Sequence, residues 1–200
     1  MALVTAAEAR LAIPALTSTG EDSNLDRLID RAGAVLAAWC GYPPASAGGV
    51  ATFEDATYTM VLDGPGGLEL ALPVGPLVSV TSVHSDPLRE YGSDVLVASG
   101  DYTLDNHRSL IVLNDDSAQG AWGLGYRAIK VVFVAGFETV PVDIKQAAIA
   151  QVAHWWRLRR QAGKRSINQE GGTATLLPET MPPQVAQLMG PSRLAEVCFG

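Results

Sequence analysis

Cysteine, histidine and aromatic residues are scarce in this chain of 200 residues, which has two cysteines, three histidines and 6% aromatic residues. Cys40 and Cys198 are too few for a disulfide framework and too far apart for a metal knuckle. The apolar runs are shorter than the roughly 20 residues of a membrane-spanning helix. The first residues lack the basic and apolar regions of a secretion signal. We therefore expect a soluble protein of a reducing compartment, without a membrane span.

Recognisable catalytic motifs are also missing. The sequence has no Gly-x-Ser-x-Gly elbow, and the glycine-rich segments 64–67 and 120–125 lack phosphate-cradling spacings, so we interpret them as turns. His84, His107 and His154 have no second ligand at metal-binding spacing. We expect no enzyme, cofactor or metal. One alternative stays open, a metal-assisted hydrolase in which His107 and nearby loop oxygens hold a hard cation such as Ca²⁺. Those oxygens would come from Asp105, Asn106, Asp115 and Asp116.

Positive charge is the minority sign, with 14 basic against 21 acidic residues and a net charge of −7. This balance argues against a surface that binds nucleic acid throughout. Residues 51–140 carry 12 acidic and 4 basic side chains, whereas residues 141–200 carry 4 acidic and 7 basic ones. An acidic middle and a basic end predict two parts with different surroundings.

Apolar residues, 48% of the chain, show a helical period near both ends. Thr5 and Glu8 match a capping box, and Pro14 should stop the helix that follows. Residues 23–40 are predicted to be a helix, because apolar side chains recur every three or four positions at Leu25, Leu28, Ile29, Ala32, Val35, Leu36 and Trp39. Residues 142–158 are apolar on nearly all sides, which is typical of a central core helix. We expect Trp39 and Trp155 or Trp156 to be buried between these helices.

Between the helices the period changes to that of short strands. We predict strands at residues 57–62, 68–72, 77–84, 101–104, 109–113 and 126–135. Strands in succession without helices between them imply an antiparallel sheet or small barrel. The fold class is therefore α+β, with N-terminal helices (1–49), an inserted β block (50–137), a long core helix (138–161) and an extended C-terminal tail with a short helix (162–200).

The tail is the best candidate for binding a partner. Residues 162–181 are predicted to be a loop, and 182–190 a short helix that must dock to be stable. Candidate contacts are the basic cluster and the tail anchors, namely Arg157, Arg159, Arg160, Lys164, Arg165, Val185, Leu188, Met189, Arg193, Leu194 and Phe199. The cluster either complements the helix dipole or meets an acidic partner or phosphates. We expect the tail to leave its own globule as an arm that binds the partner, and the alternative is that it folds back on its own helices.

The order of several short motifs resembles that of the head–tail connector (adaptor) proteins of long-tailed phages and gene transfer agents. The resemblance begins in residues 3–9 and 25–42 and continues through 72–80, 101–102 and 134–156. It ends with Pro182-Pro183, Leu188-Met189 and Arg193. The motifs that carry it include Trp39-Cys40-Gly41-Tyr42, Leu72-Pro73-Val74-Gly75-Pro76, Val134-Ala135-Gly136-Phe137 and Val152-Ala153-His154-Trp155-Trp156.

The resemblance implies a structural protein rather than an enzyme. It implies a homo-oligomeric, dodecameric ring that binds the portal protein and the next component, a head-completion (stopper) or tail-terminator protein. Double-stranded DNA would pass through the lumen without sequence-specific binding. The protein would act in the neck of a virion or phage-like particle assembled in the host bacterial cytoplasm. The alternative from the residues alone is a nucleic-acid-binding module that uses the Arg157–Arg165 cluster.

Overall fold

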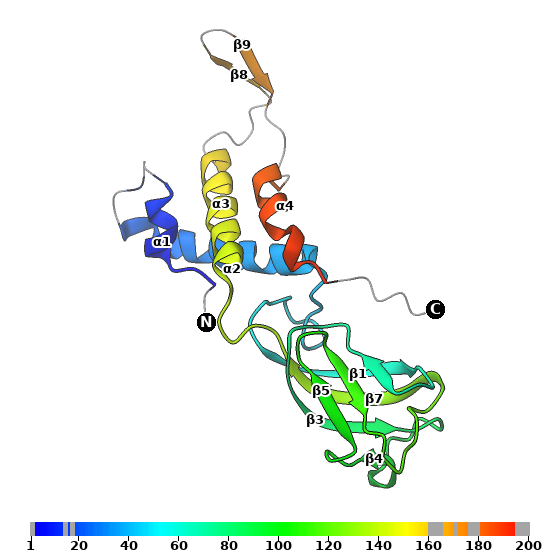
Figure 1. Ribbon diagram of the computed structural model, residues 1–200. Coiled ribbons are helices and arrows are strands. Elements are labelled where there is room, and N and C mark those ends of the chain that lie inside the picture. The colour runs from blue at the N-terminus through cyan, green and yellow to red at the C-terminus, as the bar shows by residue number, and fades with distance from the viewer. Residues whose placement is uncertain are drawn as a thin grey trace. The chain divides into compact units, whose positions relative to one another are not determined.

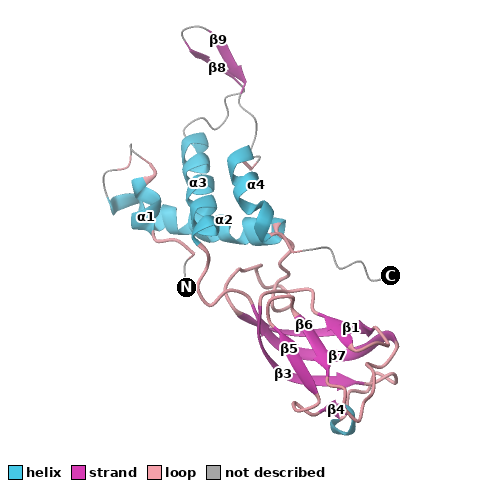
Figure 2. Cartoon of the chain, viewed as in Figure 1, coloured by secondary structure: helices cyan, strands magenta, loops and turns pink. Residues whose placement is uncertain are grey.

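The computed structural model describes residues 3–13, 16, 19–159, 166–169, 172–175 and 181–194. The chain divides into two compact units, shown with their elements in Figures 1 and 2. The helical unit is built from Met1–Leu36 and Val140–Arg193, and the β unit from Ala37–Thr139 and Leu194–Gly200. Helices together with antiparallel sheets confirm the predicted α+β class.

The helical unit contains most of the helices that the sequence predicts. Its elements are α1 (Ala6–Leu11), η1 (Thr19–Glu21), α2 (Asp22–Trp39, whose last turn belongs to the β unit), α3 (Val142–Arg159), α4 (Pro183–Met189) and η3 (Gly190–Ser192). The capping box of α1 is present: Thr5 Oγ1 accepts the Glu8 N–H at 3.2 Å, and Glu8 Oε2 accepts the Thr5 N–H at 2.8 Å. The bond from the Thr5 N–H lowers the pKa of Glu8, because it favours the charged carboxylate.

The core of the helical unit follows from the apolar faces of α2 and α3. On α2 the fully buried positions are Leu25, Ile29, Ala32 and Leu36. Val35 is exposed and Trp39 is half-buried, so the buried stripe is narrower than predicted, and Trp39 is not part of the core as expected. On α3 the buried residues are Ile144, Ala147, Ala148, Gln151, Val152, Ala153 and Trp156. Helix α3 packs against both α1 and α4, as a core helix should.

The β unit contains two antiparallel sheets (Figure 2). One has the order β1-β7-β3-β4 and the other the order β2-β6-β5. The strands are β1 (Ala56–Gly64), β2 (Glu69–Ala71), β3 (Leu77–Ser85), β4 (Leu96–Val97), β5 (Tyr102–Asp105), β6 (Leu110–Leu113) and β7 (Gly125–Ala135). All six predicted strand regions are present, while β4 and the preceding turn η2 (Ser93–Val95) were not predicted, because two residues show no period.

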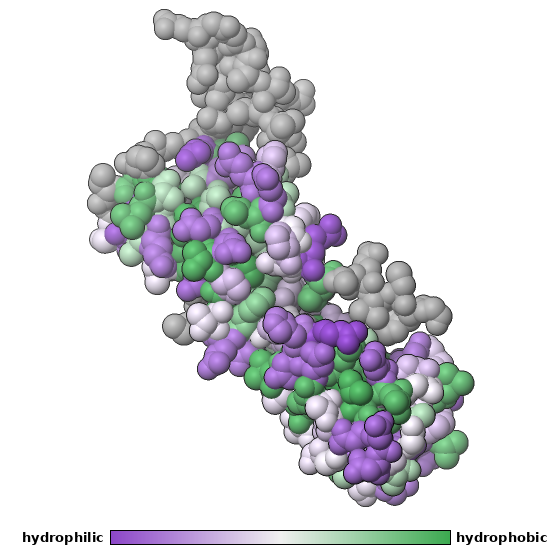
Figure 3. All heavy atoms as spheres, in the orientation of Figure 1, coloured by the Kyte–Doolittle hydropathy of each residue, from purple (hydrophilic) through white to green (hydrophobic). Residues whose placement is uncertain are grey.

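The alternation of buried and exposed side chains along the strands shows which residues form the core of the β unit. Tyr58 lies opposite Phe133 in the β1–β7 register, and their rings stack with centroids 5.6 Å apart. Thr57 and Thr59, on either side of Tyr58, are exposed. Trp122 is buried and donates its indole N–H to the Leu68 carbonyl at 2.9 Å. Polar and apolar side chains are mixed on the outer surface (Figure 3), as expected for strands with one buried side.

The predicted loop at residues 162–181 contains a hairpin in its described part. Strand β8 (Ser166–Gln169) pairs antiparallel with β9 (Gly172–Thr175). The prediction of an unstructured loop is therefore wrong for these eight positions. Backbone pairing in a hairpin needs no apolar stripe, and the segment gives no hydrophobic period from which it could be predicted.

Replacement of Trp156 tests the core of the helical unit. Trp156 is buried on α3, so Trp156→Ala should lower the free energy of unfolding by about 3–5 kcal/mol. Half-buried Trp39 is the matched control, and Trp39→Ala should cost clearly less. Denaturant titration followed by helical circular dichroism measures both. Equal losses for the two variants would show that the core has been assigned wrongly.

Candidate partner interface

The end of α3 carries the described part of the basic cluster. Arg157 is exposed, whereas the Arg159 guanidinium lies 3.8 Å from the ring centroid of Trp156. Arg159 Nη1 also lies 3.3 Å from Oε2 of Glu21. The pKa of Glu21 is lowered by hydrogen bonds, first from the Asn24 amide and then from Arg159. Arg159 is thus engaged inside the helical unit, and Arg157 presents its charge to solvent.

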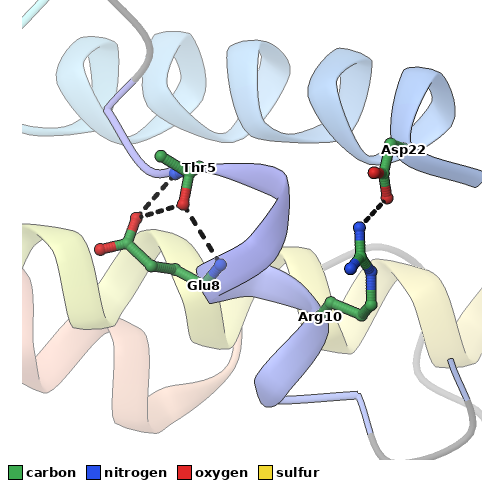
Figure 4. Close-up of polar contacts among 4 residues, drawn as sticks. All are labelled: Thr5, Glu8, Arg10 and Asp22. Atoms are coloured by element: carbon green, nitrogen blue, oxygen red, sulfur yellow. Dashed lines mark hydrogen bonds and ion pairs between the residues drawn. The ribbon is translucent and has the colours of Figure 1, made fainter. Parts of the chain in front are cut away.

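Two further arginines also hold helices of this unit together. The Arg31 guanidinium on α2 lies 4.8 Å from the centroid of Trp155 on α3. Arg10 on α1 donates a hydrogen bond to the carboxylate of Asp22 at the start of α2 (Figure 4). Figure 4 also shows the capping box of α1. Arg10, Arg31 and Arg159 therefore contribute to packing inside this unit.

The short helix α4 lies against α3 within the helical unit. The two helices run antiparallel (Figure 1), and Val185 and Met189 are fully buried. Leu188, on the other side of α4, is 39% exposed. Two of the side chains expected to anchor in a partner are therefore used inside this chain, and Leu188 remains accessible.

The described tail ends close to the last turn of α2. Arg193 is exposed, and the next residue, Leu194, donates its N–H to the Cys40 carbonyl at 2.8 Å. Its side chain also lies beside Gly41. Residues 181–194 thus fold back on their own chain, so the expectation of an arm that leaves the globule is wrong for these residues, because the apolar side chains Val185 and Met189 are buried within the chain itself. Four candidates lie outside the described residues, namely Arg160, Lys164, Arg165 and Phe199.

In the polar loops suggested as a cation site, Asp105 and Asn114, which precedes Asp115, make hydrogen bonds within the chain. Asp105 Oδ1 accepts the Arg108 N–H at 3.0 Å, and Asn114 bonds to Thr103 at 2.7 Å and to the Gly100 carbonyl at 2.7 Å. Among the described residues, no three histidine, cysteine or acidic side chains come together as a metal site would require. Within the residues that the structure describes, no helix has the length and apolar character needed to cross a membrane.

One group of exposed residues was missed by the sequence analysis. Leu88, Leu124 and Tyr126 are large, apolar and largely exposed, and they stand in or next to turns of the β unit. The only available signal was the pair of apolar residues around Gly125, at the start of a predicted strand. It was overlooked because the neighbouring glycines were interpreted as a turn alone.

A pair of substitutions on α4 tests whether the tail is docked. Met189→Ala should lower the free energy of unfolding by about 2–5 kcal/mol, because it leaves a cavity beneath α4. Leu188→Ala, one position away and partly exposed, should cost less than about 1 kcal/mol. Thermal and denaturant unfolding of the full chain measure both. Small and equal effects would indicate that α4 does not belong to the core.

A second prediction concerns His154, on the half-buried side of α3. Burial, together with the positive charge of Arg157, lowers the pKa of His154 below its ordinary value of 6.5. The unfolded chain then binds a proton that the folded chain resists, so stability is complete above about pH 7 and falls as the pH drops through 6.5. His154→Gln should flatten this decline between about pH 7.5 and about pH 5.5, as measured by unfolding. The exposed-loop variant His107→Gln is the control and should retain the decline.

Comparison with known proteins gives a family match and several similar solved structures. The family model described as "Head completion protein" matches residues 3–194. One similar solved structure is described as the neck of an empty GTA particle computed with C6 symmetry. It is 22% identical with a TM-score of 0.58, over 98% of this chain and 91% of that chain. No curated protein matches the chain in sequence.

The family match runs from α1 to the end of η3 and so includes both helical segments and the β unit between them. The structural similarity likewise covers nearly the whole chain and shows the same fold. The resemblance to head–tail connectors noted in the sequence is confirmed. The chain belongs to the head completion protein family.

Proposed function

We propose that this protein is a connector subunit that forms a ring under the portal of a phage-like particle. The ring joins the portal to a stopper or tail-terminator protein and surrounds the channel through which double-stranded DNA passes. The observation that carries the proposal is the family match across residues 3–194, which includes both the helical unit and the β unit. In this proposal the β block is an insertion between the helices of the connector.

Symmetry supports a ring with a multiple of six subunits. The related neck was computed with C6 symmetry, which a dodecameric ring also possesses. Identical subunits close into a ring through head-to-tail contacts, in which two different surfaces of each copy meet. We propose a dodecamer with one copy for each portal subunit.

The portal contact is proposed to lie at the basic cluster and the outer side of α4. Arg157, Leu188 and Arg193 are exposed there, whereas Val185 and Met189 hold α4 in place. Arg160, Lys164, Arg165 and Phe199, which lie outside the described residues, are proposed as further contacts on the basis of the sequence alone. A few apolar anchors surrounded by arginines are typical of the residues that dominate binding energy in protein interfaces.

DNA is proposed to pass by without being held. Residues 37–139 of the β unit carry 12 acidic and 4 basic residues, and such a surface repels phosphates. Arg159 is already bonded to Glu21 and stacked on Trp156. These features favour the connector over a nucleic-acid-binding module.

Mixing the purified full chain with the portal of the same particle tests the proposal. We expect a complex of fixed stoichiometry by native mass spectrometry and a ring under the portal by electron microscopy. Arg157→Glu combined with Leu188→Ser should weaken portal attachment, while thermal unfolding stays unchanged because both side chains are exposed. The matched charge reversal Arg108→Glu, on an exposed turn of the β unit, should leave attachment intact.

If the chain does not bind the portal at micromolar concentration, the connector proposal fails. If it binds duplex DNA instead, with an affinity that falls steeply with salt, the nucleic-acid-binding alternative is correct.

A further inference from the structure

Strand β1 lies at one edge of the β1-β7-β3-β4 sheet and pairs with a neighbouring strand on one side only. In an antiparallel pair, alternate residues of each strand direct their backbone N–H and C=O groups away from the partner strand. On β1 these groups have no backbone partner among the described residues, because the backbone hydrogen bonds of β1 are those with β7. The outer edge of β1 is therefore open to pairing with another strand.

The other edges of the two sheets in the β unit have features that β1 lacks. Strand β4, at the far edge of the same sheet, is only two residues long. In the second sheet, β2 has three residues and carries Glu69, and β5 has four residues and carries Asp105. Short strands and charged side chains discourage pairing with a further strand. In contrast, β1 has nine residues, and from Ala56 to Leu62 it has no charge, no proline and a regular register with β7.

The buried side of β1 is incompletely covered at its centre. Tyr58, Met60 and Leu62 point to the same side of the sheet, because side chains alternate along a strand. Tyr58 and Leu62 are buried, whereas Met60 between them is only half-buried. An apolar side chain on an added strand would complete the cover over Met60.

The end of the described chain lies in the same unit as β1 and leads toward it. The Leu194 N–H donates to the Cys40 carbonyl at 2.8 Å, and the Leu194 side chain lies beside Gly41. The ring of the next residue, Tyr42, packs edge-on against the ring of Phe53, with centroids 5.1 Å apart. Phe53 stands three positions before the first residue of β1. A series of contacts thus runs from the last described residue to the start of the open edge.

The residues that follow Leu194 have a sequence suited to a strand. In residues 195–200, which lie outside the described residues, Ala195, Val197 and Phe199 occupy alternate positions. A period of two predicts one apolar side and one more polar side in an extended chain. Six extended residues span about 20 Å, so the segment is long enough to follow several residues of a strand.

We propose that residues 195–200 pair with the outer edge of β1 of the same chain as an additional strand. Their backbone bonds to the outward N–H and C=O groups of β1, and an apolar side chain of the segment covers Met60. Addition of a strand to an open sheet edge is a common way to bind an extended segment. The segment is joined to the β unit itself, so its effective concentration at the edge exceeds that of a separate chain at micromolar concentration.

The pairing belongs to the free chain. Phe199 is also proposed as a contact with the portal, and one segment cannot occupy both places, so attachment to the portal releases it from β1. Until then the segment keeps the open edge from pairing with strands of other copies, which is how exposed edges lead to aggregation. The inference rests on the proposed function for this release, whereas the pairing itself is a property of the chain alone.

Hydrogen exchange of the full chain, resolved at single amides by nuclear magnetic resonance, tests the pairing. The β1 amides that bond to β7 are an internal control, because they are protected with or without an added strand. The outward amides should exchange about ten-fold more slowly in the unmodified chain than in a variant that combines Val197→Pro with Cys198→Pro. Proline has no N–H, and two in succession remove a donor from each side of the segment.

The matched control combines Val197→Ile with Cys198→Ser, which keeps both N–H groups and the β-branched side chain. It should exchange like the unmodified chain. Unchanged protection of the amides bonded to β7 shows that each variant folds. Fast and equal exchange of the outward amides in the unmodified chain and in the double-proline variant would overturn the proposal.

Chain concentration distinguishes the same chain from a second copy as the source of the strand. Pairing within one chain should give the same protection at about 10 μM and at about 1 mM, with no dimer in sedimentation experiments. Protection that grows with concentration together with dimers would show that a second copy occupies the edge. That result would overturn the pairing within one chain.

Addition of the portal separates this inference from the proposed function. In the complex, measured by mass spectrometry, the outward amides of β1 should lose their protection when the segment is released. If the chain does not bind the portal, the proposed function fails, and exchange in the free chain still decides the pairing. Outward amides that are unprotected in the free chain and become protected in the complex would show that the portal supplies the strand, and would overturn the proposal.

Discussion

Burial of α3 is the constraint on which the helical unit depends. Seven of its side chains are buried, on more than one side of the helix, so a single neighbouring helix cannot cover them. Helices α1 and α4 pack on it, and α2 contributes Arg31 to cover the ring of Trp155. These helices come from both ends of the sequence. The helical unit is therefore complete only when the two segments on either side of the β unit have met.

The arginines of the helical unit combine packing with charge. A guanidinium is planar and weakly hydrated, so it can lie on an indole ring and still donate hydrogen bonds at its edge. Arg159 does both, with Trp156 beneath it and Glu21 at its edge. A lysine at this position would provide the charge but not the planar stacking. The composition of the basic cluster is thus explained partly by internal structure, and only partly by a partner.

The limits of sequence analysis follow from what periodicity measures. Periodicity predicted α2, α3 and the main strands, because apolar residues recur in each of them with the spacing of a helix or of a strand. Pro182-Pro183 at its start and Gly190 at its end predicted the short helix α4, but these signals do not say whether the surface that covers it belongs to the same chain. Exposure of Leu124 and Tyr126 depends on how distant segments of the β unit meet, so the pair of apolar residues around Gly125 could not by itself show that they are exposed. The family was recognised because the order and spacing of several motifs together are specific, although each motif alone is weak.

The insertion of the β unit between α2 and α3 has a consequence for synthesis on the ribosome. Residues 37–139 are continuous, so both sheets have all their strands before α3 is translated. Until then Leu25, Ile29 and Leu36 of α2 have no α3 to complete the core around them. Because domains generally fold as units in the order in which they are synthesised, the β unit should fold first. The first helices would meanwhile expose an apolar stripe, which is the kind of surface that chaperones bind in a nascent chain.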